Sequence, residues 1–187
     1  MSQPWTHTTH SPAYPRIDEH YVEPSWCSER LFEEEEFRGS IYDPACGFGR
    51  IVTSARQAGY HAYGTDKVDR GEGMPVRDFL DCRRMHDNIV SNPPFNIFPA
   101  FAQLAVMLTH RKTALIMPTA RLNAARWLQT MPLARIWMLT PRPSMPPGHV
   151  IKAGGHVGGG KSDYCWLVFA QDHAGSPEVR WLERGKL

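Results

Sequence analysis

Residues 41–59 read Ile-Tyr-Asp-Pro-Ala-Cys-Gly-Phe-Gly-Arg-Ile-Val-Thr-Ser-Ala-Arg-Gln-Ala-Gly, and this stretch decides the fold. Its first four residues, 41–44, predict a short buried strand that ends at a proline. A glycine-containing turn follows, and apolar residues then recur at helical spacing over 50–58. Gly59 stands where a helix C-terminal cap belongs. The stretch therefore predicts a strand, a tight turn and a helix in succession.

The same strand, turn and helix pattern recurs along the chain. Further strands are predicted at 61–65, 78–80, 88–91, 113–117, 136–139 and 164–170, and helices at 20–37, 96–110 and 120–129. Ser25 or Ser28 is the expected cap of the first helix, and Thr119 that of the last. Alternating strands and helices favour an α/β architecture with a largely parallel sheet. In such sheets the ligand site lies at the carboxyl ends of the strands.

Length and composition fit one domain spanning 1–187. The chain has 187 residues, of which 42% are hydrophobic, and this supports one core but not two. Residues 1–19 are expected to be a disordered lead-in. No apolar run approaches the ~20 residues of a membrane span. The four cysteines form no CxxC pair and the histidines show no ligand spacing, so we expect no metal site and reduced thiols in a cytoplasm.

The turn after the first strand begins with an acid, Asp43, and contains Gly47 and Gly49. Glycines let a bulky ligand approach the backbone. The turn lacks the Lys-Ser/Thr of a phosphate-binding loop and the full GxGxxG of a dinucleotide site. An acid at this place suits a ligand with a cationic ammonium group, as in a methionine moiety. The alternative is a tight turn in which Asp43 merely caps the helix.

Two more acids follow predicted strands. Asp66 could accept hydrogen bonds from both hydroxyls of a ribose, and Asp78 could accept one from an adenine amino group beside the π-face of Phe79. Taken alone, these positions favour the simpler interpretation, a surface aspartate at 66 and an ordinary aspartate beside a core phenylalanine at 78 and 79.

Asn92-Pro93-Pro94-Phe95 follows the strand at 88–91 and carries the strongest functional signal. Two prolines fix the backbone so that Asn92 projects at a strand end. An exocyclic amine is a poor nucleophile because its lone pair is delocalised into the ring. The Asn92 side-chain oxygen and the Pro93 carbonyl can each accept one of its N–H bonds and free that lone pair, while Phe95 stacks on a flipped base. The alternative is a rigid turn before the next helix.

The pair DPACGFG and NPPF, with acids at 66 and 78, resembles the class I N-methyltransferases, in particular the N6-adenine DNA methyltransferases. The similarity covers about 20–182. Small phage- or prophage-borne members also carry a segment like 21–26, Tyr-Val-Glu-Pro-Ser-Trp, and late runs like 142–149 and 158–164. The resemblance implies a Rossmann-like α/β fold, with helices on both faces of a seven-stranded, mostly parallel sheet whose last strand is antiparallel.

The resemblance also implies S-adenosyl-L-methionine as cofactor and DNA as partner. The methionine part of the cofactor would be held by Asp43, Pro44, Ala45, Gly47 and Gly49, the ribose by Asp66, and the adenine by Asp78 and Phe79. Trp26 or Tyr21 would close over the cofactor, and Asn92, Pro93, Pro94 and Phe95 would hold the target base.

Residues 141–162 are rich in proline and glycine and predict a long mobile loop. Its cations make it the preferred candidate for DNA contact: Arg142, His149, Lys152 and Lys161. The net charge of +2 neither demands nor excludes a polyanion.

Several alternatives stay open. Motifs of the NPPF type also occur in enzymes that act on cytosine N4, on RNA bases and on protein glutamine, and an inactive nucleic-acid-binding module could keep the fold. Methylation at cytosine C5 is disfavoured because no Pro-Cys pair supplies the thiolate nucleophile. The recognition sequence, the oligomeric state and a restriction partner stay undetermined at this level.

Overall fold

The structure is a computed structural model that describes residues 20–155 and 158–185, so the predicted lead-in 1–19 lies outside the described residues. Its strands form one seven-stranded sheet in the order β2-β1-β3-β4-β6-β5-β7. The strands are β1 (Ile41–Asp43), β2 (Ala62–Gly64), β3 (His86–Ser91), β4 (Thr109–Pro118), β5 (Leu133–Thr140), β6 (Tyr164–Ala170) and β7 (Glu178–Glu183).

The sheet is mostly parallel. β1 pairs in parallel with β2 and β3, and β3 pairs in parallel with β4. β6 is antiparallel to both β4 and β5, and β7 is parallel to β5. β6 alone therefore opposes the direction of the other strands. The resemblance implied that the last strand is antiparallel, and this is wrong in position: the antiparallel strand is β6, and the last strand, β7, is parallel to β5.

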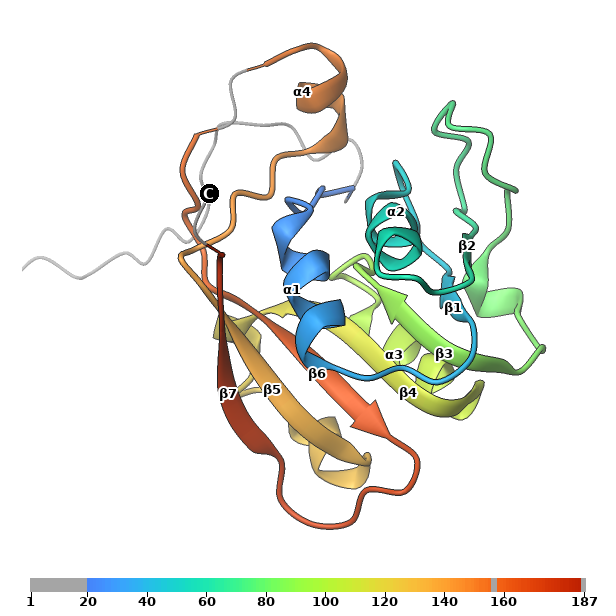
Figure 1. The fold of residues 1–187 in the computed structure, drawn as a ribbon, viewed down its shortest axis with the longest axis vertical. Coiled ribbons are helices and arrows are strands. Elements are labelled where there is room, and N and C mark those ends of the chain that lie inside the picture. Colours follow the sequence, from blue (N-terminus) through green and yellow to red (C-terminus); the bar gives the residue numbers. More distant parts are fainter. Residues whose placement is uncertain (1–19, 156–157, 186–187) are drawn as a thin grey trace, which may run out of the picture.

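Helices cover both faces of the sheet (Figure 1). α1 (Trp26–Glu34) and α2 (Arg50–Gln57) lie on one face, and α3 (Phe98–Met107) lies on the other. Successive residues of a strand point to opposite faces. In β4, Ala114 and Ile116 accordingly join the cluster under α1 and α2, while Leu115 and Met117 join the cluster under α3. A sheet buried on both faces reads as a continuous apolar run, as this strand does.

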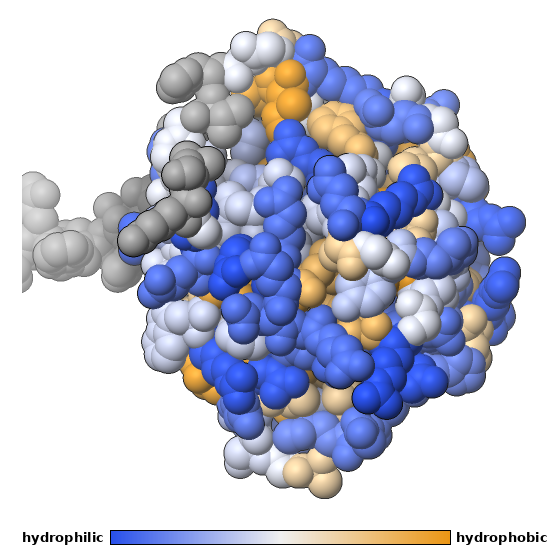
Figure 2. All heavy atoms as spheres, viewed as in Figure 1, coloured by the Kyte–Doolittle hydropathy of each residue, from blue (hydrophilic) through white to orange (hydrophobic). Residues whose placement is uncertain are grey.

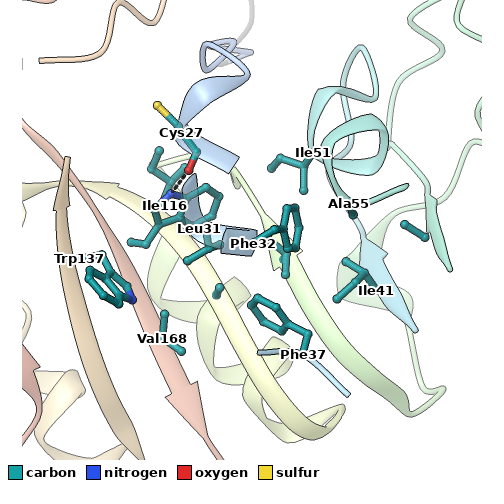
Figure 3. Packing of buried hydrophobic residues seen from close by; sticks show 14 of the residues in the cluster. Cys27, Leu31, Phe32, Phe37, Ile41, Ile51, Ala55, Ile116, Trp137 and Val168 are labelled. Carbon is teal, nitrogen blue, oxygen red and sulfur yellow. Dashed lines mark hydrogen bonds between the residues drawn. The ribbon is translucent and has the colours of Figure 1, made fainter. Parts of the chain in front are cut away.

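The cluster under α1 joins helix to helix as well as helix to sheet (Figure 3). Leu31 is fully buried there between the two helices and the sheet. Ser28 Oγ donates to Ser54 Oγ at 2.9 Å, and Trp166 Nε1 donates to the Cys27 carbonyl at 2.9 Å. Ser25 occupies the N-cap of α1 without a side-chain capping bond, and Ser28 uses its hydroxyl inside the core. The expectation that either serine hydroxyl caps this helix is wrong.

The strand expected at 78–80 does not form. Residues Phe79–Asp81 form a short 3-10 helix, η1, and Asp78 Oδ1 accepts the Leu80 amide at 3.0 Å. A side chain that takes a neighbouring N–H competes with strand pairing. The seventh strand of the sheet is instead β7, in which only Leu182 is buried.

The helix expected at 120–129 is replaced by two short 3-10 helices, η2 (Thr119–Arg121) and η3 (Arg126–Thr130). Leu122, Trp127 and Leu128 all pack against the cluster under α3. Separations of five and six residues cannot share one face of an α-helix with 3.6 residues per turn. The chain therefore breaks between them, and Thr119 makes no side-chain bond that caps a helix.

The proline- and glycine-rich segment 141–162 contains a short helix, α4 (Gly148–Lys152). Its start pairs with the residues before α1. Val22 N donates to the Pro146 carbonyl at 3.0 Å, and Gly148 N donates to the His20 carbonyl at 2.8 Å. In Figure 1 α4 accordingly lies at the same end of the molecule as the start of α1.

The surface is mixed in character. Figure 2 shows a face that is mostly hydrophilic, with hydrophobic residues scattered between the charged ones. Among residues 20–155 and 158–185, no helix combines the length and the apolar character that crossing a membrane requires.

Candidate active site

The turn between β1 and α2 contains two backbone conformations that only glycine adopts easily. Gly47 has φ +53° and Gly49 has φ +74°, both in the left-handed region. A Cβ atom at Gly47 would collide with the His20 ring. Cys46 N donates to the Thr65 carbonyl at 2.9 Å, which ties the turn to the end of β2. The predicted tight turn is present, and it follows the carboxyl end of β1 directly.

Asp43, the last residue of β1, is buried at 1% exposure. Its Oδ1 accepts hydrogen bonds from Ser91 Oγ at 2.7 Å and from Ala45 N at 3.2 Å. Burial raises the pKa of Asp43 well above its usual value, and the nearby carboxylates of Glu23 and Asp66 raise it further. A buried acid of this kind favours a cationic partner that would hold it ionised.

Asn92 lies beside this acid because β1 and β3 are adjacent parallel strands. Ser91, which bonds Asp43, is the residue before Asn92. Asn92 Nδ2 donates to the Tyr21 carbonyl at 2.7 Å and to Glu23 Oε2 at 2.8 Å. The carboxyl ends of these two parallel strands therefore meet at one place.

Phe95 closes the tetrapeptide in a nest of aromatic and cationic groups. It is 8% exposed, and its ring lies nearly parallel to that of Tyr21, at 11° and 6.2 Å between centroids. Arg121 donates to the Phe95 carbonyl, and its guanidinium lies 5.7 Å from the centre of the ring. The Tyr164 ring packs against the Phe95 ring, with 6.1 Å between the two ring centroids. These contacts hold the buried Phe95 ring in place, outside the lining of the adjacent cleft.

Asp66 joins the β2 end to the glycine turn. Its Oδ2 accepts the Gly47 amide at 2.9 Å, and its Oδ1 accepts the Val68 amide at 2.9 Å. Arg70 Nε lies 3.4 Å from Oδ1 in an ion pair. The residue is buried, so it is a fixed part of the site and not the surface aspartate of the alternative interpretation.

Asp78 and Phe79 reach the same cleft from η1. Phe79 is 3% exposed and packs on Phe101 of α3 at 4.6 Å between ring centroids. Asp78 Oδ2 pairs with Lys67 Nζ at 2.7 Å. That hydrogen bond with Lys67 keeps the pKa of Asp78 below its usual value, so this acid is ionised at neutral pH.

One cleft collects most of the predicted site. It is lined by the predicted residues Pro44, Ala45, Asp66, Asp78, Phe79, Asn92 and Pro94, together with Tyr21. A smaller hollow adjoins it and shares Tyr21, Ala45 and Asn92. It is lined in addition by Glu23, Asp43 and Gly47.

Glu23 is the site residue that sequence reasoning missed. It is 6% exposed, and its carbonyl accepts Arg50 Nη1 at 2.9 Å. Burial raises the pKa of its carboxyl group. Within the described residues, no lysine or arginine forms an ion pair with Glu23 or Asp43. Its one sequence signal was its place between Tyr21 and Trp26.

Trp26 is not brought to the cleft. It is half-buried and packs against the core under α1 and α2, whereas Tyr21 lines the cleft. Of the two aromatic residues expected to close over the cofactor, the structure places only Tyr21 at the site.

The four cations expected to contact DNA lie in different surroundings. Lys152 donates to the Arg70 carbonyl, and its Nζ lies 5.3 Å from the centre of the Phe48 ring in the β1–α2 turn. Arg142 pairs with Asp163 at 2.7 Å. His149 and Lys161 are exposed. Lys152 is therefore a contact of the glycine turn.

The part of the chain that is described contains no group of three or more His, Cys, Asp or Glu side chains that could hold a metal ion. Glu23 accepts from Asn92, and Asp66 accepts from two backbone amides.

No protein-family model matches the chain, and no curated protein matches it. Solved structures do match. The M protein of the type I restriction enzyme EcoKI is 13% identical, with a TM-score of 0.57, over 83% of this chain and 44% of that protein. Magnesium protoporphyrin IX methyltransferase from Synechocystis PCC 6803, solved with bound S-adenosylmethionine, is 16% identical with a TM-score of 0.53 over 79% and 77%.

A predicted O-methyltransferase from Agrobacterium tumefaciens is 12% identical, with a TM-score of 0.58, over 87% of this chain and 89% of that one. Identities this low bear on the fold alone. Together with the mostly parallel seven-stranded sheet and its single opposed strand, they show that this chain has the Rossmann-like α/β fold of class I methyltransferases.

Proposed function

We propose that the protein is an S-adenosylmethionine-dependent DNA methyltransferase that modifies the exocyclic N6 of adenine. One observation carries the proposal: the Asn92–Phe95 tetrapeptide leaves β3 directly beside the buried Asp43 that ends β1, and Ser91 bonds the two strand ends together. A methyl donor held at the first strand end would face an amine held at the second.

The residues at the end of β1 fit the charge of the cofactor. Asp43 and Glu23 are buried carboxylates without an ion-pair partner among the described residues. Buried charges are stable only when they are paired or hydrogen-bonded. S-adenosylmethionine carries an ammonium and a sulfonium group, and either cation would lower the pKa of these acids and favour their ionised form. The bound cofactor would supply an activated methyl group.

The remaining cofactor contacts follow the cleft. Asp66 would bind the ribose hydroxyls, and Asp78 with Phe79 would hold the adenine. Pro44, Ala45, Gly47 and Gly49 would let the methionine part approach the backbone. Tyr21 replaces Trp26 as the aromatic residue available to cover it.

The tetrapeptide would orient the target amine. Both Asn92 Nδ2 hydrogens are used by Tyr21 and Glu23, so Oδ1 is the atom that Asn92 presents as an acceptor. Oδ1 and the Pro93 carbonyl would each accept one N–H of the amine, and the ring of Phe95 would stack on the flipped base. Pro94 would keep the backbone rigid. Orientation and polarisation of this kind suffice for a direct in-line transfer.

DNA would approach over the mouth of the site. Arg121 lies against Phe95, and Arg142, His149 and Lys161 are exposed on the segment that follows β5. Lysine and arginine contacts of this type bind phosphates and set position, not sequence.

The test is methylation of plasmid DNA by the purified protein with S-adenosylmethionine, followed by mass spectrometry of the nucleosides. We expect N6-methyladenine, and we expect Asn92→Ala to abolish it while cofactor binding persists. Gln57→Ala, which truncates an exposed amide at the end of α2, is the matched control and should keep full activity. RNA and protein substrates are assayed in parallel.

Three outcomes would replace this proposal. N4-methylcytosine would change the base and keep the chemistry. Methylated RNA or glutamine without methylated DNA would change the substrate. Absence of cofactor binding by calorimetry would favour an inactive binding module.

A further inference from the structure

We propose that Glu23 is a positioning residue that fixes the Asn92 side-chain amide in the one orientation that turns Oδ1 toward the substrate amine. The inference rests on the proposed function only for the identity of that amine. The amide orientation itself is a property of the protein without substrate.

The geometry leaves the amide one choice. Asn92 Nδ2 meets two acceptors, the Tyr21 carbonyl at 2.7 Å and Glu23 Oε2 at 2.8 Å. An asparagine amide has two donor hydrogens on nitrogen and only lone pairs on oxygen. If the amide rotated by half a turn, Oδ1 would face two acceptors and both hydrogen bonds would be lost. The orientation that satisfies them is also the orientation that catalysis requires.

Glu23 is itself held in place. Its carbonyl accepts Arg50 Nη1 at 2.9 Å, and the preceding Val22 donates to the Pro146 carbonyl at 3.0 Å. The residue is 6% exposed, so its carboxylate cannot turn to bulk water. A rigid, buried residue that hydrogen-bonds a functional side chain fixes the position of that side chain.

The charge of Glu23 adds to its geometry. Hydrogen bonds to an ionised acceptor are stronger than neutral ones, so the carboxylate holds the amide firmly and increases the electron density on Oδ1. An amine that loses electron density during methyl transfer gains from a stronger acceptor. Only the ionised form does this. A protonated Glu23 could donate to Oδ1 of the inverted amide, which would then lose only its bond to the Tyr21 carbonyl.

Several groups face this carboxylate. They are Arg50 on α2, Asp43 at the end of β1, Cys27 on α1, and His20 and Tyr21 in its own segment. Burial raises the pKa of Glu23, and Arg50 offsets this only in part. The ionisation of Glu23 should therefore appear as an acidic limb in the pH profile of kcat.

A double-mutant cycle tests the orientation directly. Glu23→Gln keeps the shape of the residue and removes its charge, and we expect kcat to fall about tenfold or more while cofactor affinity changes less than threefold. Asn92→Asp replaces the donor with an acceptor that would repel Glu23. In the Asn92→Asp background, Glu23→Gln should instead raise kcat, because the glutamine amide can donate to the new carboxylate. Glu33→Gln, an exposed carboxylate on α1, is the matched control and should change nothing.

Equal effects of Glu23→Gln in both backgrounds would overturn the proposal, because a merely structural Glu23 has no reason to reverse sign. A loss of cofactor affinity as large as the loss of kcat would also overturn it, since Glu23 would then act on the cofactor. Preserved cofactor binding shows in each case that the variant is folded.

A second measurement needs no turnover. The Asn92 side-chain NH₂ signals, assigned by their absence in Asn92→Asp, should exchange slowly with solvent and should shift with pH through a pKa above 4.5, the usual value for glutamate. In Glu23→Gln this titration should vanish. Signals that do not respond to the variant would refute the role of Glu23. If the signals respond but no DNA is methylated, the assigned substrate is wrong and the orientation by Glu23 stands.

Discussion

Ser91 Oγ donates a hydrogen bond of 2.7 Å to Asp43 Oδ1, and both atoms are buried. This bond joins the last residue of β3 to the last residue of β1. The acid proposed to hold the cofactor and the tetrapeptide proposed to hold the base are thus coupled through one hydroxyl group. The two halves of the site are also joined through the backbone, because their strands pair directly.

Ser91→Ala should weaken cofactor binding. The hydroxyl lowers the pKa of Asp43 against the larger opposing effect of burial, so its removal leaves the acid protonated to a higher pH. We expect the Kd for S-adenosylhomocysteine to rise about tenfold, equivalent to ~1.4 kcal/mol, with a larger effect at pH 6 than at pH 8. Titration calorimetry at both pH values measures it.

The control for that change is Ser28→Ala, which removes another buried hydroxyl, in this case one bonded to Ser54 in the core. It should lower stability without changing the Kd. An unchanged Kd for Ser91→Ala at both pH values would show that the hydroxyl does not support Asp43.

Asp43→Asn should stabilise the protein without cofactor while it abolishes cofactor binding. Because burial raises the pKa of Asp43, the folded state binds its proton more tightly than the unfolded state does. The free energy of unfolding therefore falls as pH rises from the unfolded pKa, near 3.8, through the folded pKa. Asparagine removes this penalty and keeps an oxygen for Ser91.

We expect the gain from Asp43→Asn to be about 1–2 kcal/mol at pH 8 and to vanish near pH 4. Urea unfolding at the two pH values measures it, and calorimetry with S-adenosylhomocysteine measures the lost binding. Equal destabilisation at both pH values would mean that Asp43 is ionised without strain in the fold.

The parts of the site that sequence could predict are those carried by one short stretch of chain. Asp43 and the glycine turn predict the end of one strand, and Asn92 predicts the end of another. Parallel strands bring their carboxyl ends to one edge of a sheet, so these motifs had to meet once the sheet was parallel. Asp66 follows the same rule after β2.

Glu23 could not be found this way, because its partner Asn92 lies 69 residues further along the chain. No periodicity links an acid before a helix to an amide after a later strand. Trp26 shows the converse. It is a large aromatic residue near the site in sequence, but the helical geometry of α1 packs it, half-buried, against the core and away from the cleft.

The misassigned strand has a local cause and the missed strand a distant one. Asp78 bonds the Leu80 amide and starts a turn that periodicity cannot reveal. In β7, Trp181 is 63% exposed and only Leu182 is buried. A strand held by the edge of β5 carries little hydrophobic pattern of its own.

Lys152 should matter for the cofactor more than for DNA. Its ammonium group lies over Phe48 of the glycine turn and bonds the Arg70 carbonyl. Lys161, on the same segment, is exposed as Lys152 is. We expect Lys152→Ala to raise the cofactor Kd about threefold, in line with a cation–π contact at an exposed site, with little change in DNA affinity.

Lys161→Ala is the matched comparison. It should leave the cofactor Kd unchanged and should reduce both DNA affinity and the slope of that affinity against salt concentration, as the loss of a phosphate contact does. The assignment of Lys152 to the cofactor side fails if both variants weaken DNA binding and neither weakens cofactor binding.

Glu35→Gln should destabilise the fold without affecting the site. Glu35 is 2% exposed and accepts hydrogen bonds from Lys112 Nζ at 2.8 Å, from Trp137 Nε1 at 2.9 Å and from Arg135. Removal of its charge leaves Lys112 without its anion and Arg135 with only the longer 3.6 Å contact to Glu178. The cost should be about 2–4 kcal/mol after allowance for the partial exposure of both cations.

The pH dependence gives this prediction a sign. Burial alone would raise the pKa of Glu35, but the hydrogen bonds from Arg135, Lys112 and Trp137 together lower it. Its contribution to stability is therefore present above the unfolded pKa of 4.5 and is lost as pH falls through the lower folded pKa. In urea unfolding, the wild-type protein and Glu35→Gln should differ at pH 7, and the difference should shrink as pH falls below 4.5.

Lys112 and Arg135 lie near the amino ends of β4 and β5. The cleft lies at the opposite, carboxyl ends of the strands. Cofactor affinity should accordingly be the same in Glu35→Gln and in the wild-type protein wherever both are folded. A variant that loses cofactor affinity at pH 7 while it remains folded would show that the two edges of the sheet are coupled, and the role of Glu35 would then extend beyond the stability of the core.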